Sequence, residues 1–379
     1  MAIKYQICTN CVMDTTDPDI FFNETGVCSH CVEFSKSAEV GYFGNIEWFP
    51  NEIGTIKLNA IGQNIKNAKG NRKYDCIMGI SGGVDSCFLA LKVKELGLNP
   101  LVVHIDTGWN SELAVWNIEK IIKYCDFDLY THVVDWDEMR DLQLAYLKAA
   151  VANQDVPQDH VIFAMLWKTA AKHGIKYFLS GGNQATESIF PKAWHGPALD
   201  KINLLSIHKK FGDSPLKTYS TISFFERYIW YPIINRLKII RPLNYMEYNK
   251  EKAITELEQI GWRNYGRKHG ESIFTKFFQN YYLPVKFGYD KRRPHLSSLI
   301  VNGQLSREDA IEKLNEPLYN KEELEADISF FCKKLRINRK EFNDIMEIKP
   351  HDYKEFATWD KYFNIGKQIQ GFLKHRKSK

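Results

Sequence analysis

Between residues 74 and 180, short apolar runs alternate with longer stretches in which apolar residues recur every three or four positions. The short runs predict strands and the longer stretches predict helices. The expected strands are 74–80, 101–105, 129–134 and 176–180. The expected helices between them are 86–96, 112–124, 137–152 and 159–173. Short turns between alternating strands and helices predict an α/β fold with a doubly wound parallel sheet, and ligands of such sheets bind beyond the carboxyl ends of the strands.

The regular alternation stops after about residue 205. Residues 223–240 are rich in aromatic and apolar side chains, most of which we expect in the core. Helices are expected at 56–68, at about 250–260 and from Ser306 onward. We therefore divide the chain into four parts, which are a cysteine-rich segment, a connecting segment, the α/β domain and a mostly helical, substrate-binding region, at 1–40, 41–70, 71–240 and 241–379.

Composition is that of an ordinary globular protein, with 44% hydrophobic and 26% charged residues in a chain of 379. The net charge of +5 is small, so we expect no nucleic-acid partner. No apolar run approaches the roughly 20 residues of a membrane span, and no signal peptide is evident at the N-terminus. We therefore expect a cytoplasmic protein that does not act at a membrane.

The motif at residues 81–86 lies between the first predicted strand and the first predicted helix. Two adjacent glycines allow the backbone to approach an anion, and the first helical turn directs its N–H groups at that anion. No Gly-Lys-Ser/Thr follows, so this is not a Walker A loop. The motif matches the SGGxDS signature of the PP-loop ATP pyrophosphatases; the alternative is an ordinary turn that starts a helix. The expected ATP ligands here are Ser81, Gly82, Gly83, Val84, Asp85 and Ser86, with catalytic roles for Ser81 and Asp85.

Two further strand ends carry polar motifs, at residues 104–110 and 180–187. The PP-loop resemblance implies that the first lies beside the nucleoside, where His104 and Asp106 would contact ATP; the alternative is an ordinary turn with a helix cap. In the second motif, the glycines would approach the nucleotide, and Glu187 would hold Mg²⁺ together with Asp85. The alternative for Glu187 is a solvated acid at a helix start. The remaining expected ligands of this motif are Gly181 and Gly182 for ATP and Asn183 for the substrate.

Four cysteines form two CxxC pairs that are separated by sixteen residues, a spacing typical of a closed zinc site. Two disulfides are the alternative, which a cytoplasmic protein disfavours, and an iron–sulfur cluster could use the same ligands. The predicted zinc ligands are Cys8, Cys11, Cys28 and Cys31. The other four thiols are scattered among apolar residues and are expected to be buried and inert; they are Cys76, Cys87, Cys125 and Cys332.

Two basic, aromatic stretches follow at residues 262–272 and 286–298. Arginine offers a bidentate fork to phosphate, and an aromatic ring can stack on a base or a sugar, so these stretches suit a nucleotide-linked sugar. The alternative is a solvated charged loop. The candidate substrate ligands in the second stretch are Lys286, Tyr289, Arg292, Arg293 and His295.

Taken together, the SGGVDS loop, the 104–110 segment, the cysteine-rich opening at residues 8–14 and the 286–298 segment resemble the N-acetyl sugar amidotransferases of bacterial surface-glycan synthesis. The resemblance implies that ATP, with Mg²⁺, adenylylates the acetamido oxygen of a nucleotide-linked sugar, and that ammonia then displaces AMP to give an acetamidino group. It also implies that a separate glutaminase, with a barrel-like companion, supplies the ammonia.

Two other functions remain open at this point. Enzymes that modify tRNA, such as thiolases and lysidine-type enzymes, also join a zinc ribbon to a PP-loop, but thiolation usually needs further paired cysteines near the loop. The small net charge also argues against a tRNA surface. A subunit that binds ATP without forming AMP is the remaining, non-enzymatic alternative.

Overall fold

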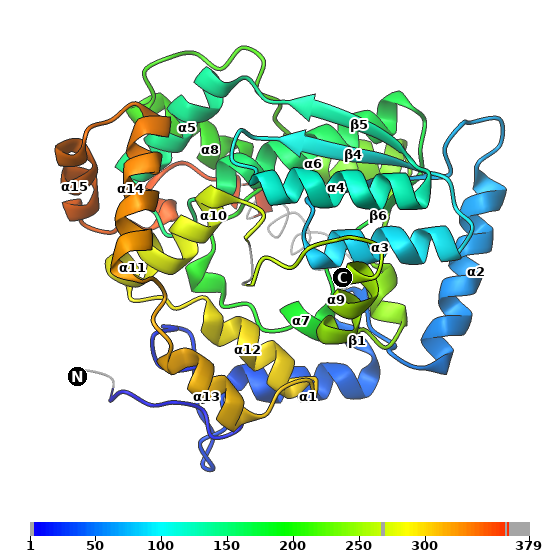
Figure 1. Ribbon diagram of the computed structural model, residues 1–379, viewed down its shortest axis with the longest axis horizontal. Helices are drawn as coiled ribbons and strands as arrows, with labels where there is room; N and C mark the ends of the chain where they lie inside the picture. The colour runs from blue at the N-terminus through cyan, green and yellow to red at the C-terminus, as the bar shows by residue number, and fades with distance from the viewer. Residues whose placement is uncertain (1–3, 267–269, 361, 364–379) are drawn as a thin grey trace, which may run out of the picture.

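Five parallel strands form the centre of the protein in the computed structural model, which describes residues 4–266, 270–360 and 362–363 (Figure 1). Their order is β5-β4-β3-β6-β7. The strands are β3 (Cys76–Gly79), β4 (Pro100–Asp106), β5 (Asp128–Val133), β6 (Tyr177–Leu179) and β7 (Lys238–Ile240). The first four confirm the strands expected from the apolar runs, and β7 adds a strand that the sequence analysis does not include.

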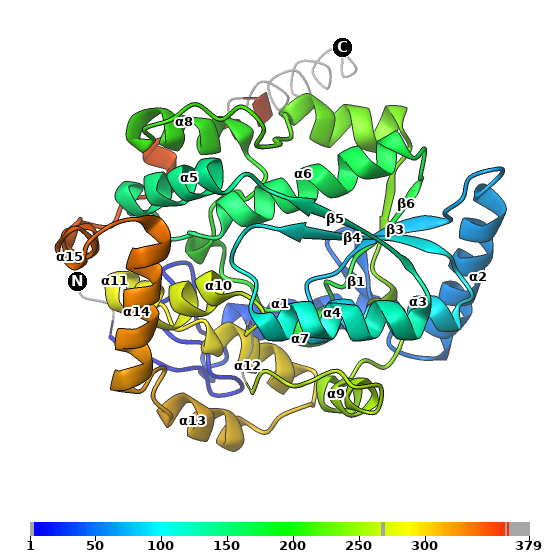
Figure 2. The ribbon, with the colours of Figure 1, turned by 45° about the horizontal axis from the view of Figure 1, so that its top comes forward.

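Helices cover both faces of this sheet, as the alternating pattern predicts (Figure 2). The helices of one face are α3 (Val84–Glu95) and α4 (Glu112–Cys125); those of the other are α5 (Trp136–Ala149), α6 (Val156–Lys172) and α8 (Lys201–Phe211). Successive strand residues point to opposite faces, so Ile77 packs with α5 and α6 while Met78 packs with α3 and α4. The prediction of a doubly wound parallel sheet is confirmed.

The N-terminal segment holds the two CxxC pairs next to helix α1 (Ser29–Val40). Cys28 is the residue before the helix and Cys31 lies in its first turn. An isolated antiparallel bridge joins Phe22 to Cys28. A small hairpin of β1 (Tyr42–Phe43) and β2 (Ile46–Glu47) and the long helix α2 (Glu52–Ala68) then lead to the sheet.

The region after the sheet is mostly helical, as expected. Its α-helices are α9 (Lys250–Glu258), α10 (Ile273–Phe277), α11 (Leu283–Phe287), α12 (Arg292–Val301), α13 (Arg307–Asn315), α14 (Lys321–Leu335) and α15 (Arg339–Glu347). Shorter elements of the chain are α7 (Gln184–Glu187), η1 (Lys192–Trp194), η2 (Glu226–Ile234), η3 (Pro242–Tyr245), η4 (Phe278–Tyr282) and η5 (Tyr353–Glu355). An aromatic core joins α10, α14 and α15 to Trp109 at the end of β4. The boundaries at residues 70 and 240 stay predictions.

One expectation about the core is wrong. The aromatic and apolar residues of 223–240 are mostly exposed, with exposed fractions of 52% for Phe225, 41% for Trp230 and 64% for Ile233. Tyr231, in contrast, is buried at 4%. Half of the segment forms the π-helix η2, of which Tyr231 is the one buried residue. Within the described ranges, no helix has the length and apolar character needed to span a membrane.

Candidate functional site

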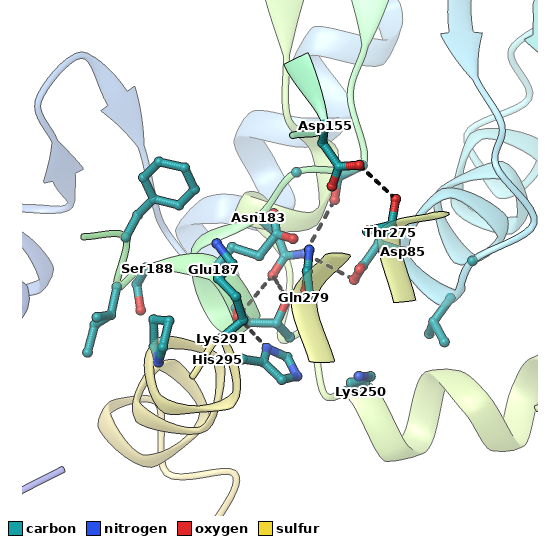
Figure 3. A pocket seen from close by; sticks show the side chains of 18 of the residues that line it. Asp85, Asp155, Asn183, Glu187, Ser188, Lys250, Thr275, Gln279, Lys291 and His295 are labelled. Atoms are coloured by element: carbon teal, nitrogen blue, oxygen red, sulfur yellow. Dashed lines mark hydrogen bonds between the residues drawn. The ribbon is translucent and has the colours of Figure 1, made fainter. Parts of the chain in front are cut away.

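A large cavity opens beyond the carboxyl ends of β3, β4 and β6, with a volume of about 2280 Å³. All three polar motifs of the strand ends contribute to its lining, and residues of α10, η4 and α12 close its other side (Figure 3). Ligand pockets usually measure roughly 300 to 1,000 Å³. The cavity therefore has room for a nucleotide and a second substrate together.

The PP-loop turns sharply from β3 into α3. Gly82 has a positive φ of 85°, and Gly83 is the residue before the helix. The Ser86 hydroxyl donates to the carbonyl oxygen of Gly83 at 3.2 Å and accepts from the Ser81 N–H at 3.2 Å. These bonds fix the loop, while the first-turn residues of α3, whose N–H groups have no partner within the helix, line the cavity. A loop of this shape can hold an anionic phosphate.

The aromatic residues of the first basic stretch support this loop from outside. The Trp262 indole N–H donates to the carbonyl oxygen of Gly82 at 2.9 Å, and the Tyr265 hydroxyl donates to the same oxygen at 3.0 Å. Glu271 lies against Gly83. Residues 267–269 of this stretch lie outside the described residues. The stretch thus reaches the nucleotide motif, and its aromatic members position the backbone of the loop.

Asp85 lies between two hydrogen-bond donors. The Tyr248 hydroxyl donates to its Oδ1 at 2.6 Å, and the Asn183 amide donates to the same oxygen at 3.1 Å. Burial raises the pKa of Tyr248 far above its usual range, and the charge of Asp85 raises it further, so the phenol stays protonated and continues to donate. Asp85 is therefore held in a fixed orientation at the start of α3.

Glu187 ends α7 and is exposed to the cavity. Arg241, just after β7, also lines the cavity. Burial lowers the pKa of Arg241, and the charge of Glu187 opposes this shift. The motif at 180–187 thus brings Gly181 against the backbone of Asp85 and directs a carboxylate at the same cavity. Two carboxylates that face one cavity are a suitable donor set for Mg²⁺.

The loop after β4 is held together by its own side chains. His104 Nδ1 donates to the carbonyl oxygen of Ile80 at 2.9 Å. The Asn110 amide donates to His104 Nε2 at 2.9 Å and to Asp106 Oδ1 at 3.0 Å. Ser111, not Asn110, caps α4. His104 and Asn110 line the cavity while Asp106 supports the turn, and their contact with a nucleoside stays a prediction.

The six candidate substrate ligands divide into two groups. Asn183, Arg292 and His295 line the cavity. The other three have partners elsewhere: Lys286 donates to the carbonyl oxygens of Ile345 and Met346, Tyr289 stacks on Trp194 with ring centres 4.7 Å apart, and Arg293 pairs with Asp14 at 2.9 Å. The structure does not bring these three to the cavity. Arg292 is itself bonded to Asp290 and to carbonyl oxygens at the end of α13.

The sequence analysis misses a group of cavity residues at the start of α6. Asp155 accepts from the Thr275 hydroxyl at 3.0 Å, and Asp159 lies one helical turn further on. Burial raises the pKa of Asp159 to about 8, and the Asp155 charge adds to the shift, while Lys291 opposes it. Lys291 donates to His195 Nε2 at 2.7 Å. The available signal was a pair of acids four residues apart, at the junction of the two helices expected at 137–152 and 159–173.

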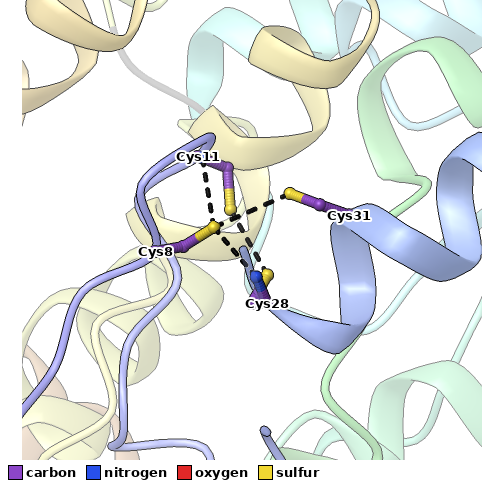
Figure 4. Close-up of side chains that lie close together, drawn as sticks. All are labelled: Cys8, Cys11, Cys28 and Cys31. Carbon is purple, nitrogen blue, oxygen red and sulfur yellow. Dashed lines mark hydrogen bonds between the residues drawn. The ribbon is translucent and has the colours of Figure 1, made fainter. Parts of the chain in front are cut away.

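The four cysteines of the two CxxC pairs converge in a buried cluster (Figure 4). Their sulfur atoms all lie within 4.8 Å of one another. They are free thiols, with 3.9 Å between Cys8 and Cys31 and 3.7 Å between Cys11 and Cys28, so the alternative of two disulfides is not what the structure shows. Backbone N–H groups donate to Cys8 Sγ at 3.2–3.4 Å, which favours a thiolate. This donor set fits a tetrahedral metal ion.

The remaining thiols are buried, as expected. Burial raises the pKa of Cys76 and Cys87 well above the usual range and that of Cys125 to about 11. Protonated thiols are poor nucleophiles. This observation argues against the sulfur-transfer alternative, because thiolation chemistry near the loop would need a reactive thiolate.

Comparisons with known proteins agree with part of the expectation. Residues 271–370 match the family model described as LPS biosynthesis protein WbpG-like, C-terminal domain. A Methanocaldococcus jannaschii protein described as uncharacterized protein MJ1599 is 23% identical over 314 residues, which is 78% of this chain and 95% of that protein.

Three solved structures are similar at a low level. They are an NH3-dependent NAD synthetase from Campylobacter jejuni (14% identity, 41% of this chain and 72% of that one, TM-score 0.28), a predicted subunit of tRNA methyltransferase from Methanocaldococcus jannaschii (14%, 48% and 75%, 0.29) and an NMN synthetase from Francisella tularensis (13%, 59% and 96%, 0.26). Likeness at this level says nothing about substrate or reaction. The chain thus combines a parallel sheet and a four-cysteine cluster with a C-terminal region that matches the WbpG-like family model.

Proposed function

We propose that this protein is an ATP-dependent amidotransferase that converts an acetamido group of a nucleotide-linked sugar to an acetamidino group, in O-antigen or related surface-glycan synthesis. One observation carries the proposal: the PP-loop and the WbpG-like domain line the same cavity. From the sheet come Ser81 and Asp85, and from the C-terminal domain come Thr275, Lys291 and His295. A phosphate cradle thus faces a domain that belongs to lipopolysaccharide biosynthesis proteins.

The first step in this proposal is the activation of the amide. An amide resists ammonia because its oxygen is a poor leaving group. The carbonyl oxygen attacks the α-phosphorus of ATP, the bond to the bridging oxygen breaks, and pyrophosphate leaves. The N–H groups in the first turn of α3 and the Ser81 hydroxyl stabilise the charge that develops on pyrophosphate. The product is an imidate that carries AMP on the former carbonyl oxygen.

Ammonia then attacks the imidate carbon. AMP leaves with the former amide oxygen, and loss of a proton gives the amidine, so one ATP yields one AMP and one pyrophosphate. Water at the same carbon would restore the amide and waste ATP, so the site must exclude it. In this reading the WbpG-like domain closes the cavity over the sugar.

Two metals belong to the proposal. Asp85 and Glu187 would hold Mg²⁺, which neutralises charge on the phosphates when it is bound. The four cysteines would hold Zn²⁺, because four buried thiols in a closed set leave no open position for a substrate. Each role concerns a different part of the chain, so the two metals can be tested separately.

A partner glutaminase, with a barrel-like channel subunit, would supply the ammonia, since ammonia is mostly protonated at neutral pH. All eight cysteines of the chain are buried, which fits a protein that does not itself hydrolyse glutamine through a thiol. We place the reaction in the cytoplasm. A mixing experiment with glutamine and a cognate glutaminase tests this part; absence of turnover with glutamine, when ammonium salts support it, would remove the partner from the account.

Isotope transfer tests the chemistry. A UDP-linked sugar with ¹⁸O in its acetamido carbonyl is incubated with the protein, ATP, Mg²⁺ and ammonium, and the nucleotides are analysed by mass spectrometry. We expect the label in the phosphate of AMP, because the amide oxygen becomes bonded to the α-phosphorus. Label in inorganic phosphate, with ADP as the co-product, would show activation by phosphorylation and refute the adenylyl intermediate.

A further inference from the structure

Helix α12 contributes Ile300 and Val301 to the apolar cluster around the four cysteines, and His295 and Leu299 to the lining of the cavity. It packs on α13 on one side and on α7 on another. The segment 183–189, which we name the α7 turn, starts with Asn183 and includes Glu187. The helix therefore touches both the cysteine-rich segment and the turn that faces Asp85, although these parts are far apart in the sequence.

The contacts on the cysteine side are buried and charged. Arg293 pairs with Asp14, which is 1% exposed, at 2.9 Å and donates to the carbonyl oxygen of Val12 at 2.8 Å. The Ser297 hydroxyl accepts from the Val12 N–H at 3.2 Å. At the start of α13, Arg307 donates to the carbonyl oxygens of Cys8 and Cys11. The backbone of the first CxxC pair is thus bonded directly to this pair of helices.

The contacts on the cavity side reach the α7 turn. The Ser298 hydroxyl accepts from the Ile189 N–H at 3.0 Å, and Asn302 donates to the carbonyl oxygen of Gln184 at 3.0 Å. His295 Nδ1 lies 3.2 Å from the carbonyl oxygen of Thr186. Ile189, which is 4% exposed, also packs into the same apolar cluster as the four cysteines. Only one residue, Ser188, separates this buried side chain from Glu187.

We infer that the metal-loaded cysteine cluster is a positioning element for the nucleotide site, which acts through α12 on the α7 turn. A bound metal would fix the first CxxC pair; Arg293 and Ser297 transmit that fixed position to α12, and Ser298 passes it to the turn. The Asn183 amide then meets Asp85 at 3.1 Å. Arg293 and Ser298 are positioning residues, because neither needs to touch a substrate to act in this way.

The test measures the turn itself. Hydrogen–deuterium exchange of peptides covering 183–189 and ATP affinity by calorimetry are compared for the wild type, the chelator-treated protein, Arg293→Met and Ser298→Ala. We expect faster exchange in the turn and ATP affinity weakened by roughly two- to tenfold, as for groups coupled within one hydrogen-bond network. Exchange in β3 and β4 should not change. Ser298→Ala should keep its metal, because its contact lies on the cavity side of the helix.

Arg339→Met is the matched control, since it removes an arginine–carboxylate pair between Arg339 and Glu325 on α15 and α14. We expect wild-type exchange and affinity there. Wild-type behaviour of the metal-free protein and of Ser298→Ala would overturn the inference, and so would faster exchange throughout the sheet, which means that the metal holds the whole fold. The inference rests on the proposed ATP site only for the affinity readout: if the wild type binds no ATP, the proposed function fails, while the exchange data still decide the coupling.

Discussion

Replacing Gly82 by alanine tests whether the PP-loop backbone is as constrained as the structure indicates. Gly82 has a φ of 85°, a region that residues with a Cβ rarely adopt. A Cβ at this position would lie 2.7 Å from the carbonyl oxygen of Ala114 and 3.0 Å from its Cα. Both atoms belong to the backbone of α4, so the neighbour cannot rotate away, and the loop or the helix must shift.

Gly44 provides a matched control. Its φ is 63°, and a Cβ built there meets nothing within 4 Å. Gly44→Ala should therefore lower the unfolding free energy by only about 1 kcal/mol, which is the cost of placing a residue with a Cβ at a positive φ. Gly82→Ala should have the same conformational cost and an overpacking cost in addition. The expected loss of unfolding free energy is therefore about 2 to 4 kcal/mol. The difference between the two variants isolates the contacts of the added Cβ with the Ala114 backbone and the Tyr265 hydroxyl.

The assay is denaturant unfolding of both variants, followed by calorimetric titration with ATP. Because Trp262 and Tyr265 both donate to the Gly82 carbonyl oxygen, a shifted loop should also misplace the phosphate cradle, and ATP affinity should fall by about tenfold or more. Gly44→Ala should bind ATP like the wild type. Equal stability of the two variants would refute the argument from the close backbone approach.

Other perturbations have equally defined outcomes. Asp85→Asn keeps the shape of the side chain but should lower AMP formation by about 100-fold or more, with unchanged metal content by elemental analysis; unaltered turnover would exclude a role for the charge. Cys11→Ser should lose the cluster metal and melt at a lower temperature, whereas a variant with full metal content would exclude Cys11 as a ligand. The backbone N–H groups of three residues after α8 donate to the Glu138 carboxylate. Burial alone would raise the pKa of Glu138, but these hydrogen bonds outweigh the effect of burial, so the pKa lies below its usual 4.5. This carboxylate thus stabilises the fold above that pH and less as the pH falls, and Glu138→Gln should flatten the acid limb of a stability profile.

The sheet and its motifs could be predicted because they depend on local pattern. The central strands β3 and β4 are short apolar runs buried on both faces, so Ile77 and Met78 both belong to the core although they enter different clusters. The three polar motifs follow directly from strand ends, which a parallel sheet gathers at one edge. Strand β7 was not predicted from the sequence, because its three residues follow the aromatic and apolar stretch of η2 and do not stand out from it.

The partners of the basic residues could not be predicted, because they depend on which distant segments meet. Arg292 and Arg293 are adjacent and suit a phosphate equally well. In the fold, Arg293 reaches Asp14 and Val12 in the cysteine-rich segment, and Arg292 reaches the end of α13. Lys286 likewise donates to two backbone carbonyl oxygens in the last turn of α15. Charge and spacing in the sequence show that a group can bind an anion; they do not show that it faces one.

The exposure of η2 has a similar cause. Aromatic and apolar content predicts burial, but a π-helix with Pro232 inside it turns most of these side chains away from the core. Asp155 and Asp159 were missed for the opposite reason, since acids at a helix start are usually solvated caps. Here Asp159 is half-buried at the cavity wall, and Lys291, the residue before α12, lies near enough to act on its charge.

A product assay tests the central claim most directly. The protein is incubated with ATP, Mg²⁺, ammonium and a panel of UDP-linked diacetamido sugars, with Asp85→Asn as the control, and sugars and nucleotides are measured by mass spectrometry. We predict a sugar lighter by about one mass unit, since OH is replaced by NH₂, with one AMP for each product and neither with the variant. Unchanged sugars across the panel, with adenylylation or modification of tRNA in a parallel reaction, would contradict the account.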